Sequence, residues 1–122
     1  MKISQLEKIV VDALEDIKGR DIQVIDTHKL SALFERIVIA SGDSNRQVRA
    51  LARNVQEKSE AAGIRPLSVE GEGNGEWILV DLGDIVVHVM QPAIRAYYNL
   101  EELWTLRPSN SARVRPDPAA TR

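Results

Sequence analysis

The chain has 122 residues, of which 43% are hydrophobic and 28% charged, a balance typical of one globular domain. The absence of cysteine excludes disulfides, thiol nucleophiles and thiolate metal sites. The formal net charge of −2 is unevenly distributed, because residues 107–122 carry +3 and leave −5 on residues 1–106. An acidic body argues against a nucleic-acid groove, which needs clustered Lys and Arg, and is compatible with a basic protein partner.

The N-terminal segment predicts an amphipathic helix over residues 5–18, where hydrophobic side chains recur at helical spacing. Ser4 and Glu7 have the spacing of a capping box, and Gly19 can supply a left-handed C-cap. No long apolar run follows Lys2, so we expect neither a signal peptide nor a membrane span, and a cytoplasmic location.

Two strands are predicted next, at 22–26 and 34–40, with a loop or short helical turn between them. A second helix follows, because Ser44 and Gln47 again form a capping box and Gly63 can end the apolar repeat. This helix also carries a second, basic face, which we interpret as solvated: Arg46, Arg49 and Arg53.

The second half predicts a third strand at 64–69, a flexible Gly-rich acidic loop at 70–75 and then a hairpin. Short helices follow at 92–98, where proline suits the first turn, and from 99 to about 106. Residues 107–122 are rich in Pro, Ser, Ala and Arg and are interpreted as a disordered tail on a single 1–106 domain. The order of elements predicts an α/β (α+β) fold in which helices pack on a mixed five-stranded sheet.

The hairpin sorts its side chains onto two unlike faces. A two-residue loop at Leu82 and Gly83 would place Trp77 opposite His88. One face is then purely aliphatic and must be covered by helices: Ile78, Val80, Ile85, Val87 and Val89. The other face is mixed: Trp77, Leu79, Val86, His88 and Met90.

Two interpretations of the mixed face remain open. A helix can cover it, which would make His88 a satisfied core histidine. Alternatively, the face can bury itself in a partner, because Trp and Met are enriched at interfaces.

Carboxylates surround this mixed face, and residues 66–94 contain no Lys or Arg. These side chains can keep a strand edge soluble, or they can frame an apolar patch and steer it to a basic partner. The carboxylates are Glu70, Glu72, Glu76, Asp81 and Asp84.

Catalytic and cofactor motifs are missing. The two histidines, His28 and His88, have no supporting motif, and the chain has no Walker loop or dinucleotide fingerprint. The turn at 41–44 can hold a phosphate at a helix start, as in nucleotidyltransferases, but no carboxylate that could bind Mg²⁺ follows until Glu57. A plain helix cap is the favoured interpretation, and we expect no enzyme activity, no metal and no cofactor.

Three blocks of sequence, in order, resemble the ribosomal silencing factor S family, also called Iojap-like. The blocks are the IASG segment with its following S-x-RQV, the hairpin segments WILVD and GDIVVHV, and the R-x-x-Y-x-L-E-x-L-W segment from Arg95. The similarity covers about residues 4–105.

The resemblance implies a fold like that of nucleotidyltransferases without their catalytic carboxylates. It also implies binding to the large ribosomal subunit through ribosomal protein L14 (uL14), which blocks association with the small subunit and represses translation when nutrients are scarce. Free members look like homodimers, and organellar relatives assist large-subunit assembly. Carried onto this chain, the partner-binding residues would be Trp77, Leu79, Asp81, His88, Met90, Arg95 and Tyr98.

Overall fold

The computed structural model describes residues 1–105, so the predicted tail and the predicted helix end at Leu106 lie outside the described residues. The helices are α1 (Ile3–Asp16), α2 (Asn45–Ala61), α3 (Pro92–Tyr98) and α4 (Leu100–Thr105). The strands are β1 (Arg20–Asp26), β2 (Arg36–Ser41), β3 (Ser68–Glu70), β4 (Trp77–Asp81) and β5 (Ile85–Met90). The predicted order of elements is confirmed.

The five strands form one mixed sheet in the order β1-β2-β5-β4-β3. Only β2 and β5 pair in parallel, and the other three pairs are antiparallel. All six residues of β5 are buried, as expected for a central strand covered on both faces. The third strand is shorter than predicted, because residues 64–67 precede the ladder and Pro66 has no N–H to give to it.

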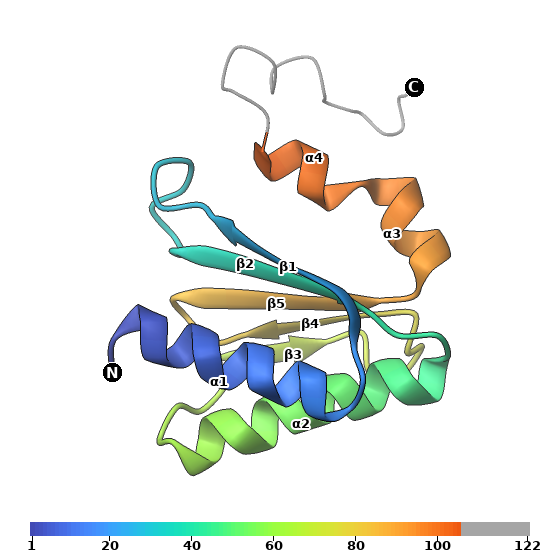
Figure 1. Ribbon diagram of the computed structural model, residues 1–122, viewed down its shortest axis with the longest axis horizontal. Coiled ribbons are helices and arrows are strands. Elements are labelled where there is room, and N and C mark those ends of the chain that lie inside the picture. Colours follow the sequence, from blue (N-terminus) through green and yellow to red (C-terminus); the bar gives the residue numbers. More distant parts are fainter. Residues whose placement is uncertain (106–122) are drawn as a thin grey trace.

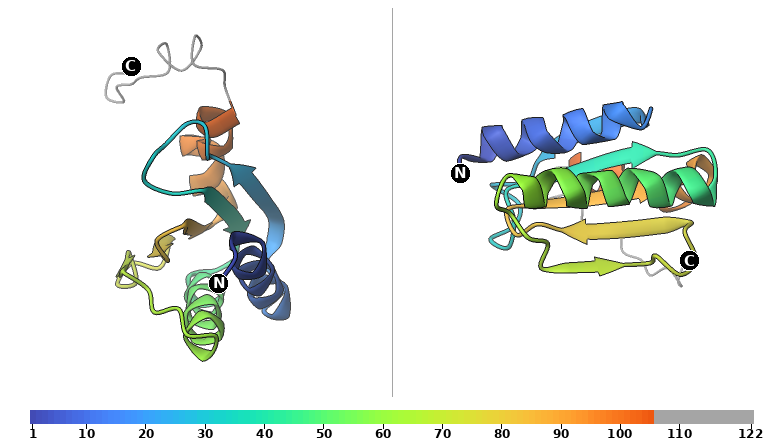
Figure 2. Two further views of the ribbon diagram at one scale, coloured as in Figure 1. Left: turned by 90° about the vertical axis from the view of Figure 1, so that its left-hand side faces the viewer. Right: turned by 90° about the horizontal axis from the view of Figure 1, so that it is seen from below.

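The first two helices lie side by side on one face of the sheet (Figures 1 and 2). Their apolar stripes bury Leu14 of α1 and Leu51 of α2 completely. The strands contribute the aliphatic side chains that alternation assigns to this face, which confirms that helices cover it: Ile78, Val80, Ile85, Val87 and Val89. Removal of these aliphatic side chains from water is the main stabilising contribution to the fold.

The last two helices lie on the opposite face, over β1 and β2 (Figure 1). There a smaller cluster forms around four buried side chains, against which Ile94 of α3 and Leu100 of α4 pack. The four are Ile25, Ile37, Ile39 and Met90. The part of this face formed by β3, β4 and β5 carries the candidate site.

The hairpin register differs from the prediction by two residues. Trp77 pairs with Met90, and Leu79 pairs with His88, because the tight turn is centred on Gly83 and Asp84. Gly83 adopts φ +93°, which glycine allows without strain. Since the shift is even, each side chain keeps its predicted face.

The ends of α1 also differ from the prediction. The helix begins at Ile3, so Ser4 lies inside it, and the side chain of Gln5 accepts a hydrogen bond from the backbone N–H of Lys2. At the other end the left-handed residue is Lys18, with φ 62°, and not Gly19. Gly19 is needed for space, because a Cβ there would lie 3.0 Å from the Leu14 carbonyl oxygen and 3.1 Å from a methyl of Leu51.

The basic face of α2 was predicted to be solvated, but one of its three arginines is engaged in contacts within the protein. The guanidinium of Arg49 donates to the carbonyl oxygens of Glu72 (3.0 Å), Gly73 (2.8 Å) and Asn74 (3.3 Å). These contacts fasten the loop that leads into β4 to the helix, whereas Arg46 remains exposed. An arginine suits this role because its rigid fork of donors reaches several acceptors at once.

The two predicted capping serines give a stability test. Ser44 Oγ accepts from the Gln47 N–H at 3.0 Å, so S44A removes a cap and should cost about 1 kcal/mol of unfolding free energy. S4A changes an exposed site within α1 and should cost nothing, because alanine is the better helix former. Urea unfolding of both variants measures the difference, and equal losses would contradict the assigned helix starts.

Candidate partner-binding surface

An indole and an imidazole interact on the mixed face of the hairpin. Trp77 and His88 are diagonal neighbours on β4 and β5, which is within reach for large side chains. The indole Nε1–H donates to His88 Nδ1 at 3.0 Å, and the ring centroids are 5.9 Å apart. Because the indole nitrogen can only donate, Nδ1 must accept and the neutral imidazole carries its proton on Nε2.

Burial keeps this imidazole uncharged. His88 is 8% exposed, and the loss of hydration lowers its pKa to about 4. A proton on Nδ1 would also oppose the indole donor. His88 therefore serves as a neutral donor and acceptor near pH 7.

Tyrosines of α3 extend the aromatic surface. Tyr98 tilts against Trp77 with centroids 4.8 Å apart, and Tyr97 meets Tyr98 edge-on at 4.9 Å. Tyr97 is 80% exposed and Tyr98 is 52% exposed, so most of their surface is open to solvent. Exposed tyrosines beside a half-buried tryptophan have the composition of interface hot spots.

Arg95, predicted to contact a partner, is engaged inside the protein. Its guanidinium binds both carboxylate oxygens of Glu101 on α4, at 3.1 and 2.7 Å, and donates to Ser41 Oγ at 2.8 Å. The hydrogen bond to Arg95 lowers the pKa of the Glu101 carboxyl. The Arg95 carbonyl also accepts the N–H of Asn99, which adopts the left-handed conformation between α3 and α4.

Local sequence patterns do not predict this contact, because Arg95 and Ser41 are 54 residues apart along the chain. The Ser41 hydroxyl is buried and occupied by Arg95, while Ser44 caps α2. The turn at 41–44 is therefore a structural joint between β2, α2 and α3.

The remaining predicted residues take different positions. Met90 is fully buried beneath the aromatic pair, so it can act on the surface only by packing. Leu79 is half-buried on the open part of the face. Asp81 ends β4, where its carboxylate accepts the Gly83 N–H at 2.8 Å. The structure thus brings Trp77, Leu79, His88 and Tyr98 together at the surface.

A groove of about 540 Å³ continues from His88 across the face towards the hairpin turn. We call it the far-face groove, and the described residues that line it are Leu33, Phe34, Ile37, Leu67, Ser68, Glu70, Leu79, Asp81, Gly83, Val86, His88 and Leu100. Two leucines on its margins are almost fully exposed, Leu33 at 84% and Leu67 at 74%. Neither was predicted to border a site: Leu33 lies in the predicted loop between the first two strands, and Leu67 lies in the segment predicted as the third strand, which enters the ladder only at Ser68.

The groove has one apolar and one acidic side. Phe34 and Leu100 lie on the side of α4, whereas Glu70 and Asp81 come from β3 and the end of β4. Residues 66–94 contain no Lys or Arg, and the imidazole of His88 is neutral, so this segment brings negative charge to the groove without a cation of its own. Such a rim attracts cationic groups and repels anions.

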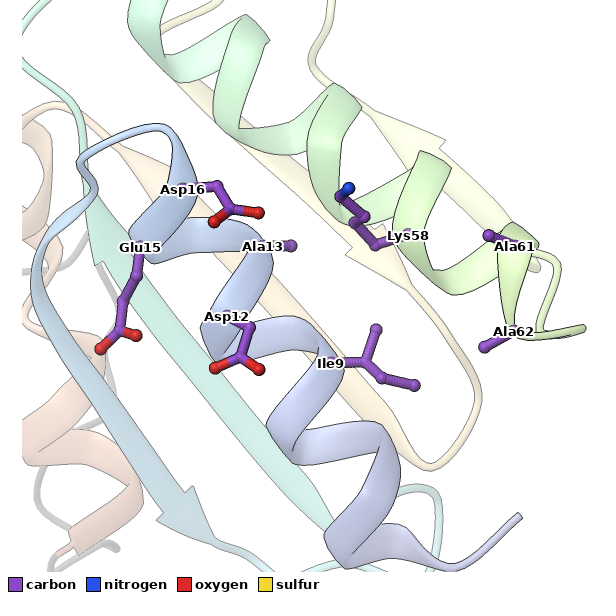
Figure 3. A pocket seen from close by; sticks show the side chains of 8 residues that line it. All are labelled: Ile9, Asp12, Ala13, Glu15, Asp16, Lys58, Ala61 and Ala62. Atoms are coloured by element: carbon purple, nitrogen blue, oxygen red, sulfur yellow. The ribbon is translucent and has the colours of Figure 1, made fainter.

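A second hollow, of about 520 Å³, lies between α1 and α2. Figure 3 shows Ile9 and Ala13 of α1 facing α2 across it, with Lys58 and two alanines on the other side. Its acidic residues are exposed, and Asp12 already pairs with Lys8. It lacks the buried polar group that distinguishes the far-face groove.

Two further properties concern only residues 1–105. No group of three or more His, Asp or Glu side chains lies close enough together there to hold a metal ion. No helix in that range is long and apolar enough to cross a membrane.

The buried imidazole should make stability depend on pH. With a folded pKa near 4 and an ordinary unfolded pKa of 6.5, the unfolded state binds the extra proton, so stability falls as pH drops through this range. Between pH 7 and 4 the wild type should lose roughly 3 kcal/mol more than H88Q, which cannot titrate there. Urea titrations at several pH values measure this, and parallel curves would contradict it.

Comparison with known proteins identifies the family. The family model described as "Ribosomal silencing factor during starvation" matches residues 1–122. A ribosomal silencing factor RsfS of Chromobacterium violaceum is 56% identical over 104 residues, which cover 85% of each chain. A crystal structure from the same organism superposes with a TM-score of 0.85 at 54% identity, covering 88% of this chain and 91% of that one.

A more distant relative is the mouse protein named "Mitochondrial assembly of ribosomal large subunit protein 1". It is 33% identical over 102 residues, which cover 81% of this chain and 45% of the mouse protein. The match to the family model spans the whole chain, and the bacterial similarity spans most of it. This chain belongs to the ribosomal silencing factor family.

Proposed function

We propose that the protein binds the large ribosomal subunit through ribosomal protein L14 (uL14), hinders association with the small subunit and represses translation under nutrient limitation. The observation that supports this is the surface formed by Trp77, His88 and Tyr98 beside the far-face groove. It is an apolar aromatic patch open to solvent on a chain of a family described by ribosomal silencing.

Charge supports a basic protein as the partner. The body of the chain is acidic, and the groove's acidic rim includes Glu70 and Asp81. Such a surface would speed encounter with a positively charged ribosomal protein and repel exposed rRNA phosphates. Binding is therefore expected to weaken as salt concentration rises.

The proposed mechanism is steric. The aromatic surface would bury itself against the large subunit, and the layer of α1 and α2 would project from the other face of the sheet (Figure 2). A body of this size on the subunit interface would collide with the incoming small subunit. No bond is made or broken, so the mechanism needs no enzyme activity and no cofactor.

A role in large-subunit assembly is the second candidate. It is favoured by the name of the mouse relative, which assigns assembly of the mitochondrial ribosomal large subunit to that protein. Both roles would use the same binding face. Nucleotide transfer is a weaker alternative, because Ser41 binds Arg95 and Ser44 caps α2 in the turn where a phosphate would lie.

We further propose a homodimer in the free state and action in the cytoplasm, where ribosomal subunits are found. Sequence-specific nucleic-acid binding and membrane binding form no part of the proposal. Whether the dimer and the ribosome compete for one face is decided by measuring the oligomeric state with and without large subunits.

Trp77 provides the first test of the binding face. W77A should weaken binding to isolated large subunits by about 30-fold or more, the loss of roughly 2 kcal/mol expected for a hot-spot tryptophan. Co-sedimentation over a range of protein concentrations measures the affinity.

E57A is the matched control, because Glu57 is exposed on α2, on the opposite face of the sheet. It should bind like the wild type, and circular dichroism should show that both variants are folded. Unchanged binding of folded W77A would remove the tryptophan from the site.

Subunit joining provides the second test. Mixing large and small subunits with a molar excess of the protein should reduce the peak of full ribosomes on a sucrose gradient, whereas W77A should restore it. If joining is unaffected but cells without the protein accumulate precursors of the large subunit, assembly becomes the better assignment.

A further inference from the structure

One hydrogen-bonding group that faces the far-face groove has no partner among residues 1–105. His88 lines the groove, its side chain is more than nine-tenths buried, and its Nδ1 accepts the hydrogen bond from the indole Nε1–H of Trp77. Its Nε2–H makes no hydrogen bond to any residue that the structure describes. Ser59 Oγ is the fully buried polar atom without a partner among these residues, so His88 Nε2–H is open to the groove and can be hydrated there. An apolar occupant that displaced this water would leave the donor unpaired unless the occupant brought an acceptor of its own.

We propose that the far-face groove binds an apolar peptide segment of the partner protein, and that His88 Nε2–H donates to a backbone carbonyl of that segment. This inference rests on the proposed function, because it names the chemistry that the binding face selects. It also gives His88 a direct role, beside the indole that fixes its tautomer.

Charge at the groove decides which acceptor fits. Glu70 and Asp81 lie on one side, and Asp84 is exposed at the adjoining turn. A phosphate or carboxylate entering the groove would meet these anions while His88 offers no positive charge in return. A neutral carbonyl keeps the hydrogen bond without the repulsion, so the occupant is protein and not RNA.

The apolar residues that line the groove indicate which side chain of the partner would lie beside the backbone carbonyl. Leu79, Val86 and Ile37 line the groove, and Leu33 and Leu67 expose most of their surface at its margins. An aliphatic or aromatic side chain of the partner would cover these groups, at about 25 cal/mol for each Å² removed from water. A Lys or Arg next to it in the partner would reach the acidic side.

Two substitutions of His88 distinguish the role of its acceptor, Nδ1, from the role of its donor, Nε2–H. In H88N the short amide lies near the depth of Nδ1, so it keeps an acceptor for the indole and loses the donor in the groove. In H88Q the longer amide presents an N–H near the depth of Nε2. Co-sedimentation with isolated large subunits should show about tenfold weaker binding for H88N, and binding within about threefold of wild type for H88Q.

Each outcome decides the proposal. Equal binding of both variants to that of wild type, or equal loss in two folded variants, would overturn the assigned donor and leave the ribosome-binding proposal standing. If the wild type itself fails to bind large subunits, the proposed function fails and this inference fails with it.

A measurement on the free protein tests the premise without ribosomes. The ¹⁵N spectrum of the His88 ring reports which nitrogen carries the proton, and it should show a protonated Nε2 and a bare Nδ1 at neutral pH. A protonated Nδ1 would overturn the proposal directly.

Discussion

The hydrogen bond between Trp77 Nε1–H and His88 Nδ1 organises the face of this protein that we propose binds the partner. It joins two neighbouring strands on the one sheet face that α1 and α2 do not cover. It holds the indole tilted, so that Tyr98 can pack against it, and it commits the remaining proton of the imidazole to Nε2. This hydrogen bond resembles one between two core residues, yet it also fixes which hydrogen-bonding group of His88 faces the neighbouring groove. The two interpretations of the mixed face are therefore compatible: His88 is buried as a core histidine would be, yet it lines an open groove.

Arg95 sets the other boundary of that face. Its bidentate contact with Glu101 and its hydrogen bond to Ser41 hold the corner between α3 and α4 against the end of β2. A guanidinium buried to this extent is stable only because these acceptors replace its water. The fixed corner places Tyr98 over Trp77 and keeps the short helices on the side of β1 and β2, so the groove over β4 and β5 stays open. The family resemblance pointed to Arg95 as a partner contact, and its internal contacts assign it a supporting position.

Much of this fold was predictable from the periodicity of the hydrophobic residues and from the positions of turn and capping residues. Alternation along the hairpin placed every side chain on its face despite a wrong register, because a shift of two residues preserves the alternation. Local signals alone were less reliable. Ser4 and Ser44 have equivalent spacing to a following Glu or Gln, yet only Ser44 caps a helix, since packing of α1 extends that helix to Ile3. The contacts of Arg49 and Ser41 were not predictable, because they join segments more than 20 residues apart that only the folded chain brings together.

The groove shows why a binding site is harder to infer than a core. Its floor comes from periodic strands, but its margins are Leu33, from a predicted loop, and Leu67, which lies just before β3 although it was predicted to belong to that strand. The features that matter for the proposed recognition are relations between residues: a donor with no acceptor among residues 1–105, and an acidic side formed by a segment, residues 66–94, that contains no Lys or Arg. Neither belongs to a single residue, and both arise only when β3, β4, β5 and α4 surround the same space. A neutral donor beside carboxylates disfavours phosphate, and apolar walls disfavour water, so the physical chemistry of the groove itself favours a protein partner over ribosomal RNA.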